Sequence, residues 1–268
     1  MKFIKMHGIG NDFVVIDNRD GKNNLTNEQV AVICDRHKGV GCDQLVMLEN
    51  SENSDVFMRF FNPDGSESGA CGNASRCVAS LICKELNQGE VELETSSGVL
   101  HTRKTADGLI AVNMGKARTN WEEIPLAKNV DTLKLPIGEG ELQNPVAVSM
   151  GNPHAVFFVD NGREIDLDVL GSKLEYNDIF PERANIGVVD VISDSEINLR
   201  VFERGAGETL ACGSGACAAV FASNSRGLTG KDVKVNLPGG ALNIKLQDDG
   251  DIIMTGTATF VFEGIITL

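Results

Sequence analysis

The sequence predicts an α+β fold of two pseudo-symmetric domains, each a curled, mostly antiparallel sheet around a central helix. Three observations support this prediction. The chain repeats itself at a constant offset, strand-like and helical stretches follow the same order in each half, and one helix per half is almost entirely apolar. The chain has 268 residues, of which 42% are hydrophobic, so it is long enough to bury two cores.

The internal repeat shows most clearly at two motifs. Asn11 opens the stretch NDFVVID, and Asn152 opens NPHAVFFVD 141 residues later. Cys71 and Cys212 are separated by the same 141 residues, and each follows a phenylalanine by ten residues. Farther along, matching Val, Gly, Leu and Asp-Gly positions recur at an offset of 142. An offset that changes by only one residue across these landmarks predicts a duplicated chain, with one small length change after the cysteines.

Alternation of apolar and polar residues predicts half-buried strands in both halves. The clearest examples are 55–61 and 90–95 in the first half, and 197–202 and 233–237 in the second.

Each half also contains two predicted helices. The first lies at 27–36 and is mirrored by 166–176. The second starts just after each Cys-Gly pair, and in the second half it ends near Arg226, where Gly227 provides a natural stop. Because this helix carries almost only small or apolar residues, we expect it to be buried inside a curled sheet.

The net charge of the chain is −14, which argues against nucleic acid or an anionic membrane as a partner, because both attract a basic face. A small anionic substrate is still allowed, since one local site can be positive. The first residues lack the apolar core of a signal peptide, and no apolar run has the length of a membrane span. We therefore expect a cytoplasmic protein with no membrane partner.

The chain contains seven cysteines, an odd number, which favours reduced thiols over a disulfide framework. Five of them are expected to pack as small buried side chains: Cys34, Cys42, Cys77, Cys83 and Cys217. The cysteine spacings differ from the Cys-x2-Cys pattern of zinc and redox sites, and the four histidines are scattered. No metal site is predicted.

Cys71 and Cys212 differ from the other cysteines because each precedes a glycine at the start of a predicted buried helix. The free N–H groups of a helix N-terminus favour an anion, such as a substrate carboxylate. They also stabilise a thiolate, so we expect the pKa of each thiol to be lowered. Two such thiols on opposite sides of a small acid suit the inversion of a stereocentre, with one as general base and the other as general acid. The helix N–H groups would stabilise the enediolate that forms on the carboxylate.

Polar residues recur in register with the two cysteines. At the offset of 141, Asn11 corresponds to Asn152, Gln44 to Asn185, and Asn62 to Glu203. A lone Asn in a turn is usually only a turn residue. Amide and acid side chains at matched positions, by contrast, are expected to line a substrate site.

Together these motifs resemble the diaminopimelate epimerase family, enzymes of lysine and peptidoglycan-precursor synthesis that use no cofactor. The matching stretches are MHGIGNDFVVID, RHKGVGCDQL, FFNPDGSESGACGNASRC, MGNPHAVFFVD, ERANIG and VFERGAGETLACGSGACAAV. The resemblance implies that the last strand returns to the first domain. Together with the repeat, this predicts the domains 1–115 plus 258–268, and 116–257. The acidic, Pro- and Gly-containing segment 116–141 is expected to link the halves.

The resemblance also implies roles for the matched residues. In the direction from L,L- to meso-diaminopimelate, Cys212 would accept the α-proton and Cys71 would donate one, and the reverse direction swaps these roles. His154 and Glu203 are implied as further catalytic positions. The implied substrate-binding residues are Asn11, Gln44, Asn62, Gly72, Asn73, Asn152, Asn185, Glu203, Arg204, Gly213 and Ser214.

Within this set, the residues that follow each cysteine would hold the reacting carboxylate. Asn11 and Gln44 would hold the nearby amino group, and the others would contact the distal amino acid end. Arg204 suits a bidentate grip on the distal carboxylate, and Glu203 suits the distal ammonium.

Proteins related by fold remain alternatives. Proline racemase-like enzymes, and other racemases that work without pyridoxal phosphate, use a similar cysteine pair, but a substrate with one charged end would not need Glu203 and Arg204. PhzF-like isomerases lack the cysteine pair. A thiol-based redox or binding protein would show no turnover, and a pyridoxal-phosphate racemase would need a lysine that recurs with the motifs. The sequence leaves the oligomeric state open, and a homodimer is among the states that it allows.

Overall fold

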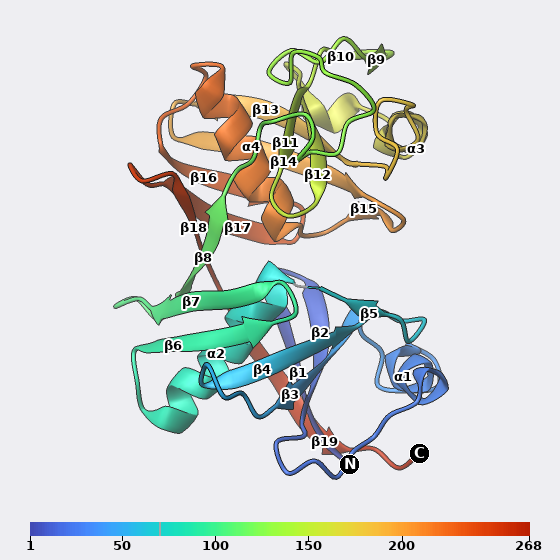
Figure 1. Ribbon diagram of the computed structural model, residues 1–268, viewed down its shortest axis with the longest axis vertical. Helices are drawn as coiled ribbons and strands as arrows, with labels where there is room; N and C mark the ends of the chain where they lie inside the picture. Colours follow the sequence, from blue (N-terminus) through green and yellow to red (C-terminus); the bar gives the residue numbers. More distant parts are fainter. Residues whose placement is uncertain (70) are drawn as a thin grey trace. The chain divides into compact units, whose positions relative to one another are not determined.

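A computed structural model describes residues 1–69 and 71–268 (Figure 1). Ala70, which belongs to the first cysteine motif, lies outside the described residues. The chain divides into two compact units. Unit 1 combines Met1–Asn113 with Thr255–Leu268, and unit 2 is Met114–Met254. Unit 1 therefore contains both ends of the chain.

Unit 1 is built on a curled, mixed sheet. Its strands are β1 (Lys2–Gly8), β2 (Asn11–Asp17), β3 (Gln44–Glu49), β4 (Val56–Phe61), β5 (Glu67–Ser68), β6 (Glu90–Thr95), β7 (Gly98–Lys104), the first part of β8 (Ile110–Lys116) and β19 (Thr259–Ile265). They pair in the order β19, β1, β2, β3, β4, β6, β7, β8, with the short β5 also beside β4. The pairs β2–β3 and β4–β6 are parallel, and the other pairs in this order are antiparallel.

Two helices belong to unit 1. Helix α1 (Asn27–Cys34) begins at a capping box, in which the Thr26 hydroxyl accepts from the Gln29 N–H and the Gln29 side chain accepts from the Thr26 N–H. Helix α2 (Gly72–Leu86) packs against β1, β2, β6 and β7 and buries its first turns. It ends at Asn87, whose left-handed backbone (φ 52°) stops the helix.

Unit 2 repeats this arrangement. Its strands are β9 (Gly138–Glu139), β10 (Leu142–Gln143), β11 (Val146–Ser149), β12 (Pro153–Phe158), β13 (Asn185–Ser193), β14 (Glu196–Glu203), β15 (Gly207–Thr209), β16 (Asp232–Leu237), β17 (Gly240–Leu246) and β18 (Asp251–Gly256). The order β11, β12, β13, β14, β16, β17 has the same pairing senses as β1, β2, β3, β4, β6, β7 in unit 1. The predicted duplication is therefore visible strand by strand.

The helices of unit 2 follow the predictions closely. Helix α3 (Leu167–Glu175) lies within the predicted 166–176, after a short 3-10 helix, η1 (Gly162–Glu164). Helix α4 (Gly213–Ser225) ends just before Gly227, which has a left-handed backbone (φ 70°). Nine of the 13 residues of α4 are buried, and most of these nine have small side chains, so the prediction of a buried helix inside a curled sheet is confirmed.

The segment 116–141 is more than the link that the sequence predicts. Ile124 and Leu135 are fully buried, and both belong to a hydrophobic cluster of unit 2 that also contains Phe157 and Ile186. Trp121 packs against the same cluster. Burial of these apolar side chains stabilises unit 2, so the segment forms part of its core.

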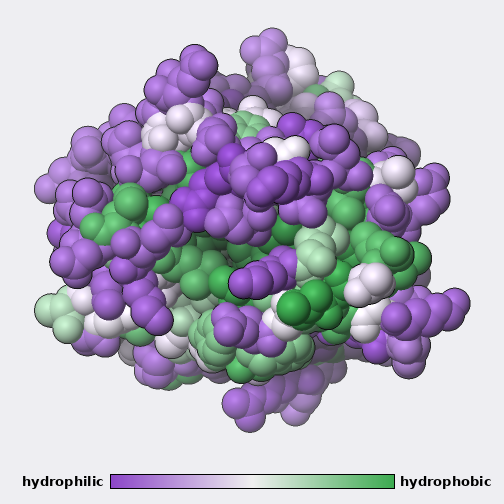
Figure 2. All heavy atoms as spheres, turned by 90° about the horizontal axis from the view of Figure 1, so that it is seen from below, coloured by the Kyte–Doolittle hydropathy of each residue, from purple (hydrophilic) through white to green (hydrophobic). Residues whose placement is uncertain are grey.

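One face of unit 1 carries exposed apolar side chains. In β19, Phe260 and Phe262 are about half exposed and Ile265 is 74% exposed. Figure 2, seen from the end where Figure 1 draws β19, shows apolar surface gathered between polar rims. Among the described residues, no helix is long and apolar enough to cross a membrane.

Candidate active site

In unit 1, Cys71 stands at the N-cap of α2. Its backbone is extended (φ −146°, ψ 111°), while its carbonyl already accepts from the N–H of Ser75 at 2.9 Å. The thiol therefore lies at the helix N-terminus, beside the free N–H groups of the first turn. Cys71 is partly exposed, which leaves it open to a small substrate.

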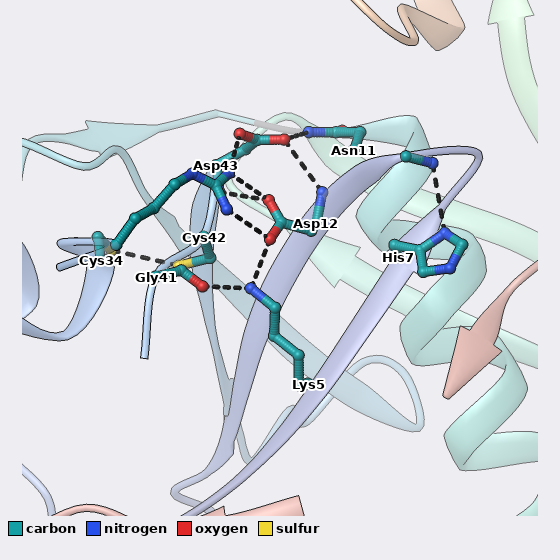
Figure 3. Close-up of polar contacts among 10 residues, drawn as sticks. Lys5, His7, Asn11, Asp12, Cys34, Gly41, Cys42 and Asp43 are labelled. Atoms are coloured by element: carbon teal, nitrogen blue, oxygen red, sulfur yellow. Dashed lines mark hydrogen bonds and ion pairs between the residues drawn. The ribbon is translucent and has the colours of Figure 1, made fainter. Parts of the chain in front are cut away.

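The structure brings three predicted residues of unit 1 together around this thiol. The Asn11 carbonyl oxygen Oδ1 accepts from Asn73 Nδ2 at 3.1 Å and lies 3.8 Å from Cys71 Sγ. Its amide nitrogen Nδ2 donates to Asp43 Oδ2 at 2.8 Å (Figure 3). Asn11 thus joins the helix N-terminus to the strand pair β2–β3.

Gln44 and Asn62 form a second predicted pair in unit 1. Gln44 is the first residue of β3, and Asn62 directly follows β4, the antiparallel neighbour of β3. Gln44 Nε2 donates to Asn62 Oδ1 at 3.2 Å. The sheet register therefore explains why residues 18 positions apart meet.

In unit 2, Cys212 stands at the N-cap of α4, again with an extended backbone (φ −126°, ψ 106°). A Cβ on Gly215 would lie 3.1 Å from Cys212 Sγ, so glycine leaves room for the thiol over the first turn. Burial raises the pKa of Cys212 well above its usual value, and the Glu203 carboxylate raises it further, against the Ser214 hydroxyl and the Gly215 N–H. The expected lowering of the pKa by the helix N-terminus is therefore wrong for Cys212.

His154 lies beside Cys212's neighbours and is neutral. Its Nε2 is 3.0 Å from Asn152 Oδ1 and 3.2 Å from Ser214 Oγ, and Ser214 Oγ is 3.6 Å from Cys212 Sγ. Burial lowers the pKa of His154 to about 3, helped by the charge of Arg204. At neutral pH this side chain can orient its neighbours but carries no charge.

The remaining predicted residues of unit 2 surround the turn that follows β14. Asn185 Oδ1 accepts from the backbone N–H of Arg204 at 2.9 Å, and Asn185 Nδ2 donates to a backbone carbonyl at 2.9 Å. The Arg204 guanidinium donates to the carbonyl of Glu182 at 3.0 Å. Glu203 Oε1 accepts from the Thr209 hydroxyl. The Asn185 bond holds the backbone at Arg204, and the other two bonds hold the Arg204 and Glu203 side chains.

Three polar residues near the candidate site were not predicted from the sequence. Arg76 is fully buried one turn along α2, and its Nε donates to the Thr257 carbonyl at 3.2 Å. Glu175 is 4% exposed and accepts from the N–H of Gly205 at 2.9 Å. Asp43 binds Asn11 and stands inside the motif RHKGVGCDQL, which was the signal that could have revealed it.

The other five cysteines are buried, as predicted. Within 1–69 and 71–268, no three His, Cys, Asp or Glu side chains gather in a way that could hold a metal ion.

Solved structures share this fold. The Bacillus anthracis phenazine biosynthesis protein of the PhzF family aligns with a TM-score of 0.71 at 17% identity, covering 100% of this chain and 99% of that one. A probable proline racemase from Agrobacterium radiobacter aligns with a TM-score of 0.70 at 14% identity, covering 100% and 93%. The chain thus has the fold of these proteins. In this chain, each of the two units has a cysteine at the start of its central helix.

Sequence comparison gives the family. The family model described as diaminopimelate epimerase matches residues 3–120 and 146–261. Diaminopimelate epimerase from Rhodospirillum centenum is 52% identical over 98% of this chain and 91% of its own length. The enzyme of that name from Acidiphilium cryptum is 48% identical over 98% and 95%. The chain belongs to the diaminopimelate epimerase family.

Proposed function

We propose that this protein interconverts L,L- and meso-diaminopimelate by moving the α-proton between two thiols, without a cofactor. The observation that carries the proposal is the repeated cysteine: each unit has one thiol at the N-cap of its central helix. Family membership supports the reaction, and the shared register of the two halves supports a paired role for Cys71 and Cys212.

In the direction from the L,L to the meso isomer, the base is Cys212 and the acid is Cys71. The Cα–H bond breaks, its proton passes to the Cys212 sulfur, and the electron pair moves onto the carboxylate as an enediolate. The Cys71 S–H then gives its proton to the opposite face of Cα, and the enediolate collapses to the carboxylate. The N–H groups that follow each cysteine, at Gly72-Asn73 and Gly213-Ser214, stabilise the extra negative charge.

Cys212 needs a change of surroundings before it can act as a base, because burial and Glu203 hold its pKa high in the free protein. A substrate ammonium beside Glu203 would offset the carboxylate's charge and so lower the cost of a thiolate. The Ser214 hydroxyl, 3.6 Å from the sulfur, can then donate to the thiolate. Substrate binding and thiol activation are thereby coupled.

The distal end of the substrate decides between this reaction and that of a proline racemase-like enzyme. Glu203 and Arg204 offer one negative and one positive group at the turn after β14, which suits a second ammonium and a second carboxylate. Asn152 and Asn185 supply further polar contacts to this distal end in unit 2, and Asn62 supplies one in unit 1. Proline has no second charged end to use them.

The test is incubation with L,L-diaminopimelate in deuterated water. Formation of the meso isomer carrying one α-deuterium supports the proposal, and Cys71→Ala and Cys212→Ala variants serve as controls. If neither the meso product nor α-deuterium appears, the proposal fails. Turnover of proline in place of diaminopimelate would favour the alternative, a proline racemase-like enzyme.

We also propose that the protein is a homodimer in the cytoplasm. The exposed apolar side chains of β19, including Phe262 and Ile265, support this, since such surface is typical of protein interfaces. Sedimentation analysis should give twice the mass of the chain, and Ile265→Glu should shift the protein towards the single-chain mass. A single-chain mass for the unaltered protein would contradict the dimer, and cell fractionation tests the location.

A further inference from the structure

Asp43 is held at the entrance to β3 by several donors. Its Oδ1 accepts from the Arg36 guanidinium at 2.7 Å, and its Oδ2 accepts from the backbone N–H of Asp12 at 3.1 Å. Its own N–H donates to Asp12 Oδ1 at 3.0 Å. Lys5 binds Asp12 from the neighbouring strand (Figure 3). The carboxylate of Asp43 therefore has a fixed place.

This carboxylate decides which way the Asn11 amide faces. An ionised carboxylate can only accept hydrogen bonds, so the Asn11 group that meets Asp43 Oδ2 at 2.8 Å must be the NH2. The carbonyl oxygen is then turned to the other side, where it meets Asn73 Nδ2 and Cys71 Sγ. An oxygen there accepts the Cys71 S–H and repels a thiolate.

Unit 2 has no carboxylate at the position that matches Asp43. The residue 141 positions after Asp43 is Ala184, which is fully buried. The counterpart of Asn11 is Asn152, which turns its carbonyl towards His154 and its NH2 towards Ser214, the neighbour of Cys212. Cys71 therefore meets an acceptor oxygen, whereas Cys212 meets a hydroxyl that can donate.

We propose that Asp43 is a positioning residue, which locks the Asn11 amide so that its oxygen holds the proton on Cys71. With the Asn11 amide held in this way, Cys71 stays protonated. A protonated thiol is what the acid of the L,L-to-meso direction requires. The assignment of Cys71 as acid rests on the proposed function. The orientation of the amide and its effect on the thiol do not.

The test measures alkylation of Cys71 by iodoacetamide at a fixed pH near neutrality, followed on its peptide by mass spectrometry. The Asp43→Ala variant copies the residue found in unit 2. Once Asp43 is gone, the Asn11 amide can turn its NH2 towards the sulfur and stabilise the thiolate, which is the reactive form. We expect Cys71 to be alkylated about tenfold faster, a change that corresponds to about one pKa unit.

A double-mutant cycle with Asn11→Ala separates the amide from direct effects of charge. If Asp43 acts through Asn11, the Asp43→Ala change accelerates alkylation only when Asn11 is present. Equal acceleration in both backgrounds, or none in either, overturns the proposal. The charged side chains near this network, Lys5, Asp12, Arg36 and Arg76, are the same throughout the cycle.

Two controls accompany the cycle. Cys77, fully buried in the same helix, must stay unmodified, because its alkylation would report opening of unit 1. Asp35→Asn removes a nearby charge whose carboxylate binds the N–H groups of His37 and Lys38, and it should leave the Cys71 rate unchanged. A rise in either control overturns the proposal.

Turnover of diaminopimelate is measured on the same proteins. Asp43→Ala should lower kcat/KM about tenfold in both directions, as the fixed equilibrium between the isomers requires. A wild-type protein without turnover would refute the proposed function and leave the alkylation result standing. A shifted alkylation rate with unchanged kcat/KM would overturn the assigned role of Asp43 in the reaction.

Discussion

Acidification from about pH 7.5 to about pH 5 should destabilise unit 2 through His154. This side chain is 1% exposed, and burial, with the charge of Arg204, lowers its pKa to about 3. In the unfolded chain a histidine has a pKa of about 6.5. Between these two values the unfolded state binds a proton that the folded state does not, so the free energy of unfolding falls as the pH falls.

The magnitude follows from the shift in pKa. The full difference between about 6.5 and about 3 corresponds to a limit of about 5 kcal/mol, reached only below the folded pKa. Between about pH 7.5 and about pH 5, the part that His154 contributes is about 2 kcal/mol. This loss belongs to one residue and can be isolated by replacing it.

Urea unfolding followed by tryptophan fluorescence measures the loss in unit 2. The chain has one tryptophan, Trp121, and it packs against the hydrophobic cluster of unit 2. His154→Gln keeps a donor for Asn152 and Ser214 but cannot titrate. The wild-type protein should lose about 2 kcal/mol more than this variant over the same pH interval, because carboxylate titration is common to both. Equal losses in the two proteins would refute a neutral, buried His154.

Three further predictions concern the thiols and the core. Replacing Cys71 or Cys212 by Ala should lower kcat/KM about 1,000-fold or more, with an unchanged melting temperature; near-normal turnover of either variant would contradict the two-thiol mechanism. Glu203→Gln should lower the pKa of Cys212, because it removes a carboxylate that raises it, so the alkylation midpoint of Cys212 should move to lower pH while KM rises. Gly171→Ala would place a Cβ 2.8 Å from Phe202 Cβ and Cγ, and overpacking of this kind should cost unit 2 about 1–3 kcal/mol in the urea assay; an unchanged stability would contradict this close contact.

The repeat could be predicted from the sequence because a duplicated chain keeps its spacing. The offset of 141 from Cys71 to Cys212 corresponds to the same strand order and the same helix start in both units. The end of α4 was also predictable, since a left-handed glycine at 227 stops a helix locally. These features depend on neighbours in the chain, which a sequence states directly.

The candidate residues were predictable as a set, but their interactions were not. The motif that contains Asp43 was visible, yet its bond to Asn11 arises from the parallel pairing of β2 and β3. The burial of Arg76 in α2 arises from contacts with the end of the chain, at Thr257. Leu135 reads as part of a linker, although it is fully buried in unit 2.

The sequence by itself determined the duplication, the two helix starts and the family to which the chain belongs. Only the tertiary structure decided the electrostatics. The helix N-terminus lies next to Cys212 in the sequence, but burial and Glu203 outweigh it and raise the pKa of the thiol. Burial likewise makes His154 neutral. Solvent exclusion and long-range charges depend on which distant residues pack together, so local motifs do not contain them.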